Sequence, residues 1–381
     1  MRYFLVAGEA SGDLHASNLM RELKKQDQEA EFCFLGGDLM QAQGGKLLRH
    51  YKDMAFMGFW AVIKNAAKIL NNFATAKNAI VDFKPDVLIL IDYPGFNLKL
   101  AQFAKENLQI PVHYYISPKL WAWKEYRLKD IKQYVDKMYC IFPFEVDFYA
   151  KRGYKVEYVG NPTVDSIDSF KKRIPAVEDF RTQNKIQNKP IIAILAGSRK
   201  QEISACLGRM IASADKFKEY QIIIAGAPGI DPIFYTSVLK ERKIKVVYGQ
   251  TYDLLSFSSA ALVNSGTATL ETALIGTPQV VVYHVIFGRA AYAIKNLFIK
   301  LKFFSLVNII AQKEVVKEFV AHHFTIENVS SELNRILNNI DYRNSILADY
   351  EIVKTDLGLP GAAQRTAKRI YETISGTKKI N

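Results

Sequence analysis

Residues 86–97 read DVLILIDYPGFN, and this stretch decides the fold. Its aliphatic run, residues 87–91, shows no alternation of polar and apolar side chains, so it predicts a strand that is buried on both faces. Asp92 ends the run, and Pro94 and Gly95 mark a turn. Such a strand between helices is typical of a parallel sheet that helices cover on both sides.

The pattern of short apolar runs between helical segments extends in both directions and occurs twice. The first series consists of Tyr3–Ala7, Glu31–Leu35, Asp86–Ile91, Pro111–Ile116, Met138–Phe142 and Val156–Val159. The second series consists of Ile191–Leu195, Gln221–Ala225, Val246–Tyr248, Ala260–Val263 and Gln279–Tyr283. Two such series predict an α/β protein of two Rossmann-like, doubly wound domains, and the length of 381 residues suits two domains.

The predicted boundary lies where the pattern pauses, after Gly160–Pro162, before a charged stretch at residues 165–189. We expect a first domain at residues 1–164 and a second at residues 165–344. A C-terminal helix within residues 345–381 is expected to cross back and complete the first domain. Ligands of such sheets bind outside the carboxyl ends of the strands, so the loops after the strands should line a cleft that the two domains share.

Composition limits the partners and the compartment. The formal net charge of +13 predicts attraction to an anionic partner, or else a generally cationic surface. No run of five like charges marks a nucleic-acid tail, so no nucleic acid is expected. No apolar run reaches the roughly 18 residues of a spanning helix and the start is not a secretion signal, so we expect a cytoplasmic protein. The cysteines are expected to be reduced and buried: Cys33, Cys140 and Cys206.

Two polar loops follow strands in the first half. The loop GEASGD could be a plain tight turn, or it could present a helix N-terminus and polar side chains to a ligand; its candidates are Gly8, Glu9, Ser11, Gly12 and Asp13. It does not match G-x-G-x-x-G. Asp92 lies at the end of an aliphatic strand, where partial desolvation would raise its pKa and suit it to accept a proton. The alternative is an Asx-type turn before Pro94.

Two further loops in the second half suit an anionic group. Arg199, after Gly197, could hold a phosphate bidentately, or it could be a solvated arginine on a surface turn. In residues 264–273 a strand ends, the chain turns and a helix begins, which makes a seat for a pyrophosphate. Glu271 has no capping partner three residues earlier, because that position is Ala268, so it could accept two ribose hydroxyls. An exposed first-turn glutamate is the alternative.

Missing motifs narrow the chemistry. No Asp-x-Asp pair occurs, the six histidines lack metal-ligand spacing, and neither G-x-S-x-G nor G-x-x-x-x-G-K-[ST] is present. We therefore expect no metal and no cofactor. The charge of a leaving group would be neutralised by helix dipoles and arginine.

Several motifs together resemble the lipid A disaccharide synthase family. They are VAGEASGD near the start, FMG at 56–58, IDYPGFN at 91–97, YYISPKLWAW at 114–123, AGSRKQEI at 196–203, SGTATLE at 265–271, SLVNIIA at 305–311 and GLPGAAQRTA near the end. The resemblance covers essentially the whole chain. It departs from the family's usual residues at four positions: Gly95, Asn161, Ala196 and Val307.

The resemblance implies a GT-B architecture and an inverting hexosyltransferase of lipid A biosynthesis in a Gram-negative bacterium. Its substrates would be UDP-2,3-diacylglucosamine and 2,3-diacylglucosamine 1-phosphate, and its products the lipid A disaccharide 1-phosphate and UDP. The base would be Asp92, and the loop at residues 8–13 would face the acceptor. The donor would contact Arg199, Ser265, Gly266, Thr267, Glu271 and Asn308. Because Gly95 replaces a common Asp, no second carboxylate is carried over to that position.

Acylated substrates would require a face that docks on an anionic membrane, and two segments suit it. In residues 59–73 apolar side chains form a helical stripe opposite lysines and asparagines, which is either core packing or an interfacial helix. In residues 289–304 lysines alternate with aromatic and aliphatic residues. The membrane-facing candidates are Trp60, Val62, Ile69, Phe73, Lys295, Lys300 and Lys302. The enzyme would then be peripheral on the inner face of the inner membrane.

Two other functions are kept open. One is an epimerase of UDP-N-acetylglucosamine, which would need no lipid. The other is a membrane-bound sensor that binds nucleotide sugars without turnover and does not require Asp92. Oligomeric state is also open, including a homodimer.

Overall fold

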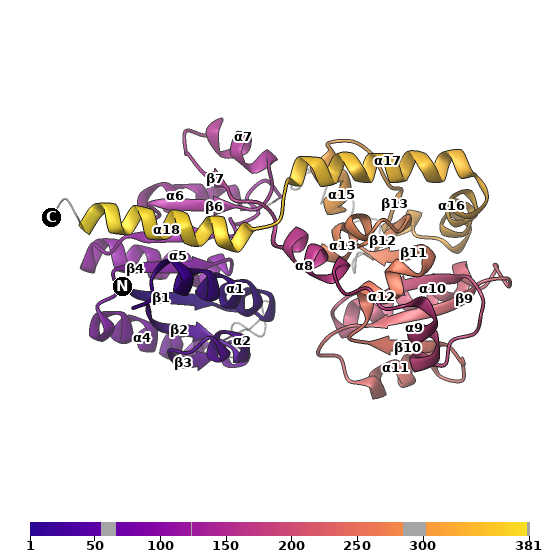
Figure 1. Ribbon diagram of the computed structural model, residues 1–381, viewed down its shortest axis with the longest axis horizontal. Helices are drawn as coiled ribbons and strands as arrows, with labels where there is room; N and C mark the ends of the chain where they lie inside the picture. Colours follow the sequence, from indigo (N-terminus) through magenta and orange to yellow (C-terminus); the bar gives the residue numbers. More distant parts are fainter. Residues whose placement is uncertain (55–65, 123, 285–301, 379–381) are drawn as a thin grey trace. The chain divides into compact units, whose positions relative to one another are not determined.

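The first of two parallel sheets is built around the aliphatic strand at residues 87–91. The computed structural model describes residues 1–54, 66–122, 124–284 and 302–378. The chain divides into two units, residues 1–162 with 359–381 and residues 163–358. Each unit has one parallel sheet with helices around it (Figure 1), which confirms the prediction of an α/β protein with two doubly wound domains.

Among the described residues, the sheet of the first unit has the order β3-β2-β1-β4-β5-β6-β7, and all its pairs are parallel. Its strands are β1 (Arg2–Ala7), β2 (Glu31–Gly36), β3 (Lys46–His50), β4 (Val87–Ile91), β5 (Val112–Tyr115), β6 (Lys137–Cys140) and β7 (Glu157–Tyr158). β1 and β4 are neighbours, and Ala7 pairs with Ile91. The loops that follow these two strands therefore begin side by side.

Helices cover both faces of this sheet. They are α1 (Ala10–Gln26), α2 (Asp38–Ala42), α4 (Ala66–Phe83), α5 (Pro94–Phe103), α6 (Leu128–Tyr134), α7 (Phe144–Ala150) and α18 (Ala362–Lys378), with short turns η1 (Tyr51–Asp53), η2 (Ala104–Leu108) and η3 (Glu125–Arg127). Phe4 and Val6 share a buried cluster with residues of α4, α5 and α6. Tyr3 and Leu5 point to the opposite face, where α1 and α18 pack. This alternation explains why the strands have no polar side.

The last helix belongs to the first unit. α18 packs beside α1 (Figure 1), and its buried Ile370 and Ile374 share a cluster with Leu19 of α1. The predicted extent of this crossing segment, residues 345–381, is too long. Residues 345–357 form most of α17 (Ile340–Leu357), which contacts α13, α15 and α16 in the second unit.

The sheet of the second unit, over the residues that the structure describes, has the order β10-β9-β8-β11-β12-β13 and is again parallel. Its strands are β8 (Ile191–Leu195), β9 (Gln221–Gly226), β10 (Lys245–Tyr248), β11 (Ser258–Asn264), β12 (Gln279–Tyr283) and β13 (Glu318–Val320). The strands β8, β9 and β11 lie at the centre, so the loops after them meet at one edge.

The helices of this unit also lie on both faces. They are α8 (Pro162–Lys171), α9 (Val177–Asn184), α10 (Lys200–Ala214), α11 (Pro232–Leu239), α12 (Thr251–Ser256), α13 (Thr267–Ile275), α15 (Leu306–Ala311), η4 (Ala321–His323), α16 (Ile326–Asn338) and α17. Phe180 of α9 and Leu254 of α12 share a cluster with Ile191 of β8. α10 and α16 contact strands β8, β11 and β12.

Candidate active site

A pocket of about 700 Å³ lies at the carboxyl ends of β8, β9 and β11 in the second unit. Five of the six predicted donor-binding residues line it: Arg199, Ser265, Gly266, Thr267 and Glu271. The loops after β9 and β10 complete the wall with Ala227, Pro228 and Gly249, and α12 adds Tyr252. The position agrees with the rule that ligands of doubly wound sheets bind beyond the carboxyl ends of the strands.

Two helices begin at this pocket. α13 starts after Gly266 and α10 after Arg199, and neither of these N-cap residues forms a side-chain cap hydrogen bond. The first N–H groups of a helix have no partner within the helix, and the helix dipole adds a partial positive charge there. The pocket can therefore hold an anion between two helix N-termini.

Gly197 lets the loop before α10 approach its neighbours. Its φ is +122°, and a Cβ at this position would lie 2.6 Å from Oε2 of Glu202 and 2.9 Å from Nδ2 of Asn264. Glu202 Oε2 accepts the backbone N–H of Ser198 at 3.0 Å, and its Oε1 lies 3.5 Å from the guanidinium of Arg199. Arg199 is thus held at the rim of the pocket with 61% of its side chain exposed.

Glu271 has a side-chain partner that was not anticipated. The hydroxyl of Tyr252 donates to Glu271 Oε1 at 2.7 Å. Burial raises the pKa of Glu271, and the hydrogen bond from Tyr252 opposes this shift. Glu271 is therefore a fixed acceptor in the wall, and its second oxygen can still accept hydroxyl groups of a ligand.

Asn308, the sixth predicted donor contact, is not among the residues that line this pocket. Its side chain is fully buried, and the amide oxygen accepts the backbone N–H groups of Val315 at 2.8 Å and Val316 at 3.0 Å. The amide nitrogen donates to the carbonyl oxygen of Val316 and to Glu318, each at 2.8 Å. Asn308 joins α15 to the segment before β13, so the structure gives it a structural role.

Asp92 follows β4 in a left-handed backbone conformation, with φ of +43°. Its backbone carbonyl oxygen accepts the side-chain amide of Asn97 at 2.7 Å and the hydroxyl of Tyr114, and its backbone N–H donates to Tyr115 at 3.1 Å. These contacts hold the turn through the backbone. Burial raises the pKa of the Asp92 carboxyl, and the charge of Lys119 opposes this shift. A half-buried carboxylate with a raised pKa is suited to take a proton.

The loop at residues 8–13 lies against the Asp92 loop. A Cβ on Gly8 would lie 2.3 Å from the ring of Tyr93, so Gly8 is required for this close packing. The Tyr93 hydroxyl donates to the carbonyl oxygen of Met54 at 3.0 Å. Glu9 is half-buried near Tyr93, and its charge adds to the burial that raises the pKa of Tyr93. Ser11 is exposed, and Gly12 is buried against Ala7.

Asp13, the last candidate of this loop, has a structural role. Its carboxylate accepts three backbone N–H groups at the start of α2, from Gly37 at 2.8 Å, Leu39 at 3.1 Å and Met40 at 3.0 Å. The side chain is buried. Asp13 therefore ties α1 to α2, and a contact with the acceptor is not needed to explain it.

Among the described residues, no group of three or more His, Cys, Asp or Glu side chains is arranged to hold a metal ion. In the same part of the chain, no helix is both long and apolar enough to cross a bilayer. The three cysteines are free and buried, as predicted.

Comparison with known proteins decides the family. A model of the family described as lipid-A-disaccharide synthetase matches residues 3–358. The chain belongs to the lipid-A-disaccharide synthetase family. The lipid-A-disaccharide synthase of Syntrophus aciditrophicus is 37% identical over 370 residues, with 95% of each chain covered. That of Myxococcus xanthus is 36% identical over 385 residues, with 98% of this chain and 97% of the relative covered.

Solved structures of other families share the fold. The UDP-GlcNAc 2-epimerase of Neisseria meningitidis, bound to UDP-GlcNAc, has a TM-score of 0.68 at 16% identity, with 99% of this chain and 100% of that chain covered. The calicheamicin glycosyltransferase CalG4 has a TM-score of 0.58 at 13% identity, with 99% of each covered. At such identities the likeness shows the two-domain fold alone.

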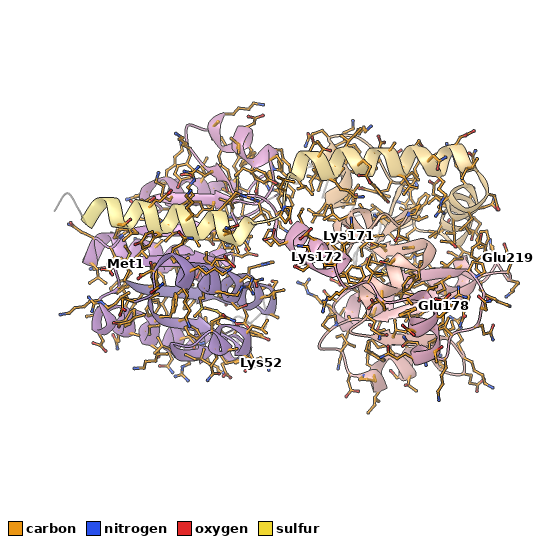
Figure 2. All side chains as sticks on the ribbon, viewed as in Figure 1. Met1, Lys52, Lys171, Lys172, Glu178 and Glu219 are labelled. Atoms are coloured by element: carbon orange, nitrogen blue, oxygen red, sulfur yellow. The ribbon has the colours of Figure 1, made fainter. Side chains whose placement is uncertain are left out.

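Three functional candidates of this family member were not predicted. Glu145 is a buried carboxylate in the first unit, Tyr252 orients Glu271, and Arg173 lines the pocket. Arg173 follows α8 within the charged stretch 165–189, where nothing in the sequence separates it from its neighbours. Its neighbours Lys171 and Lys172, both exposed, are labelled in Figure 2. Ser117 and Trp121, which lie in the motif SPKLWAW, both donate hydrogen bonds to Glu145.

The predicted membrane-facing residues differ in burial, and some lie outside the described residues. Trp60, Val62, Lys295 and Lys300 lie outside the described residues. Phe73 is half-buried and packs edge-on against Phe96 at 5.7 Å between ring centroids, so it belongs to the core. Ile69 is half-buried and Lys302 is exposed. Asn72, expected opposite the stripe, is buried and donates to the Asp53 carbonyl oxygen at 3.0 Å, whereas Leu70 is 69% exposed.

Proposed function

We propose that this chain transfers 2,3-diacylglucosamine from UDP to 2,3-diacylglucosamine 1-phosphate, with inversion at the anomeric carbon. The observation that carries the proposal is membership of the lipid-A-disaccharide synthetase family over residues 3–358. Relatives named lipid-A-disaccharide synthase match along nearly their whole length. The products are the lipid A disaccharide 1-phosphate and UDP, so the enzyme is a hexosyltransferase.

Asp92 is the general base of this reaction. It takes the proton of the acceptor hydroxyl while the oxygen of that hydroxyl bonds to the anomeric carbon of the donor. The bond from this carbon to the diphosphate oxygen breaks on the opposite face, and the electron pair leaves with UDP. The proposal is supported by the position of Asp92 at the end of β4 and by the burial that raises the pKa of its carboxyl.

The pocket of the second unit binds the UDP moiety. The diphosphate lies at the N-termini of α13 and α10 beside Arg199, and Glu271 accepts ribose hydroxyls. Two helix dipoles and a guanidinium neutralise the charge that develops on the leaving group, and no metal is required. Activity should therefore persist in a chelator; if it is abolished and a divalent ion restores it, the metal-free mechanism is wrong.

The enzyme acts at the inner face of the inner membrane, because both substrates carry acyl chains. Two observations support this: the net charge of +13 and the exposed Leu70 near the start of α4. Basic residues near an anionic bilayer contribute about 1 kcal/mol each, and salt screens this contribution.

One assay tests the function. Purified protein is incubated with UDP-2,3-diacylglucosamine and 2,3-diacylglucosamine 1-phosphate, and we expect a disaccharide 1-phosphate and one UDP for each disaccharide. The same protein is incubated with UDP-N-acetylglucosamine alone. Epimerisation of this soluble sugar without disaccharide formation would favour the epimerase, and tight UDP binding without turnover of either substrate would favour a sensor.

A further inference from the structure

Two cationic side chains at the Asp92 loop form no ion pair or hydrogen bond among the described residues. Arg127 ends η3, and Lys119 lies in the loop between β5 and η3. Among the residues that the structure describes, the side chains of both form no ion pair and no hydrogen bond. A half-buried guanidinium without a partner carries a desolvation cost that an anionic ligand would offset.

Arg127 reaches the loop from the side of α5. Its Nη2 atom would lie 3.8 Å from a Cβ placed on Gly95, three residues after Asp92. Its charge also opposes the burial that raises the pKa of Tyr114, whose hydroxyl donates to the carbonyl oxygen of Asp92. Because position 95 is a glycine, no carboxylate at this position neutralises Arg127.

Lys119 is exposed, but the loop that carries it is held firmly. Ser117 Oγ at 2.6 Å and Trp121 Nε1 at 3.1 Å both donate to Oε1 of the buried Glu145, on either side of Lys119. The Tyr149 hydroxyl donates to the carbonyl oxygen of Pro118 at 3.1 Å. The charge of Lys119 acts on the Asp92 carboxyl. Lys119, on this anchored loop, and Arg127 therefore both lie near the Asp92 loop.

We propose that Arg127 and Lys119 bind the phosphomonoester of the acceptor beside the base Asp92. The inference rests on the proposed function, since it assumes an acceptor with a 1-phosphate. A guanidinium and an ammonium together match the two negative charges of a phosphomonoester, and the planar guanidinium can bind two of its oxygens. They also counter the field of that dianion, which would otherwise oppose ionisation of Asp92.

The diphosphate of the donor is not the ligand of these cations in this proposal, because the second unit has its own anion site at Arg199 and two helix N-termini. A phosphate group of a bilayer lipid has related chemistry. The test must therefore separate the acceptor phosphate from a headgroup phosphate.

The experiment compares two acceptors, 2,3-diacylglucosamine 1-phosphate and 2,3-diacylglucosamine without the phosphate, at saturating donor. For Arg127→Ala we expect the KM for the phosphorylated acceptor to rise on the order of 10- to 100-fold, as for the loss of a charged hydrogen-bonded pair. Lys119→Ala should raise this KM less, since the side chain of Lys119 is exposed. The KM of Arg127→Lys should lie between those of the wild type and Arg127→Ala. UDP affinity should not change.

With the acceptor that lacks phosphate, the wild type should already show the higher KM, and Arg127→Ala should add nothing further. The controls are Lys129→Ala on α6 and Lys99→Ala on α5, both exposed cations, which should behave like the wild type with both acceptors. Sedimentation with anionic vesicles should be the same for Arg127→Ala and the wild type.

An equal rise of KM for both acceptors in Arg127→Ala would overturn the proposal. If KM rises equally for both acceptors and the variant also binds anionic vesicles more weakly, the cations bind bilayer headgroups instead. If the wild type forms no disaccharide with either acceptor, the proposed function itself is wrong. This result differs from an equal rise of KM in the variant, which would contradict the phosphate site alone.

Discussion

At the scale of the residue, the proposed general base is Asp92, whose carboxyl is half-buried and has a raised pKa. Asp92→Asn keeps the shape of the side chain but cannot take a proton. We expect turnover to fall by a factor on the order of 10² to 10⁴, as for the loss of a general base. UDP affinity, measured by calorimetry, should stay the same because the UDP pocket is built from other residues. Near-normal turnover would show that Asp92 is not the base.

The charge of Lys119 should be visible in the pH profile. Burial raises the pKa of Asp92, and Lys119 lowers it by favouring the carboxylate. Lys119→Gln removes the second effect, so the pKa of Asp92 should rise further. Since the base must be ionised, the acidic limb of kcat, measured at saturating acceptor, should move to higher pH. Lys99→Gln serves as the control. An unmoved limb in Lys119→Gln would contradict the electrostatic link.

Single residues also show the limit of reading roles from motifs. Asp13 and Asn308 lie in motifs that resemble the family, yet their polar atoms bind backbone groups of α2 and of the segment before β13. Those partners are 24 and 27 residues away for Asp13, so no local pattern predicts them. The raised pKa of Asp92 could be predicted, because a lone carboxylate at the end of an aliphatic strand is a local signal.

At the scale of the element, Glu145 at the start of α7 organises the loop of residues 117–122. Burial raises its pKa to about 7, and hydrogen bonds from Ser117, Trp121 and two backbone N–H groups oppose this shift. A carboxyl whose pKa is raised in the folded state binds protons more tightly there than in the unfolded state. The free energy of unfolding should therefore fall as pH rises from about 4.5 to about 7.

Glu145→Gln removes this titration, so the free energy of unfolding of the variant should change less over that pH window. The variant should also be less stable at every pH in the window, because one end of its amide carries N–H groups that face backbone donors. Denaturant unfolding at several pH values measures both effects. Glu29→Gln, an exposed glutamate, should match the wild type. A variant with the same pH slope as the wild type would contradict the assignment to Glu145.

Two apolar residues of the helix α4, three positions apart, lie in different environments. Phe73 packs against Phe96, whereas Leu70 is 69% exposed. Phe73→Ser should lower the free energy of unfolding by about 2–4 kcal/mol, as for losses of large side chains that pack against the core. Leu70→Ser should change it by less than about 0.5 kcal/mol. Denaturant titration measures both, and equal losses would place Leu70 in the core as well.

Some helices and strands could be predicted from the sequence alone, and others could not. Five-residue aliphatic runs such as Val87–Ile91 and Ile191–Leu195 predicted the central strands because a strand covered on both faces has no polar side. The apolar stripe at 59–73 did not distinguish core from membrane, since both environments select the same side chains. Residues 345–357 were predicted to cross to the first domain, whereas they belong to α17 in the second unit.

At the scale of the whole molecule, the two units carry different groups for the proposed reaction. The second unit has a pocket with two helix N-termini, which suits a diphosphate. The first unit carries the half-buried Asp92 and, near it, the cations Arg127 and Lys119. Such a division explains why the sequence could be read as two series of strands with different loops. It could not reveal that the first unit takes residues 359–381 of the predicted segment 345–381 and leaves residues 345–358 to the second unit, because packing partners such as α1 are distant in sequence.

Binding to membranes should combine a charge effect of the whole molecule with a local apolar effect. The net charge of +13 attracts the protein to anionic vesicles, and salt screens this attraction. Insertion of apolar side chains such as Leu70 is insensitive to salt screening. The protein should therefore sediment with anionic vesicles at low salt and be released in part at high salt. Leu70→Ser should weaken the fraction that stays bound at high salt, whereas Ile233→Ser, an exposed apolar residue of α11, should not. Complete release of the wild type at high salt would leave charge as the sole contribution and contradict a role for Leu70.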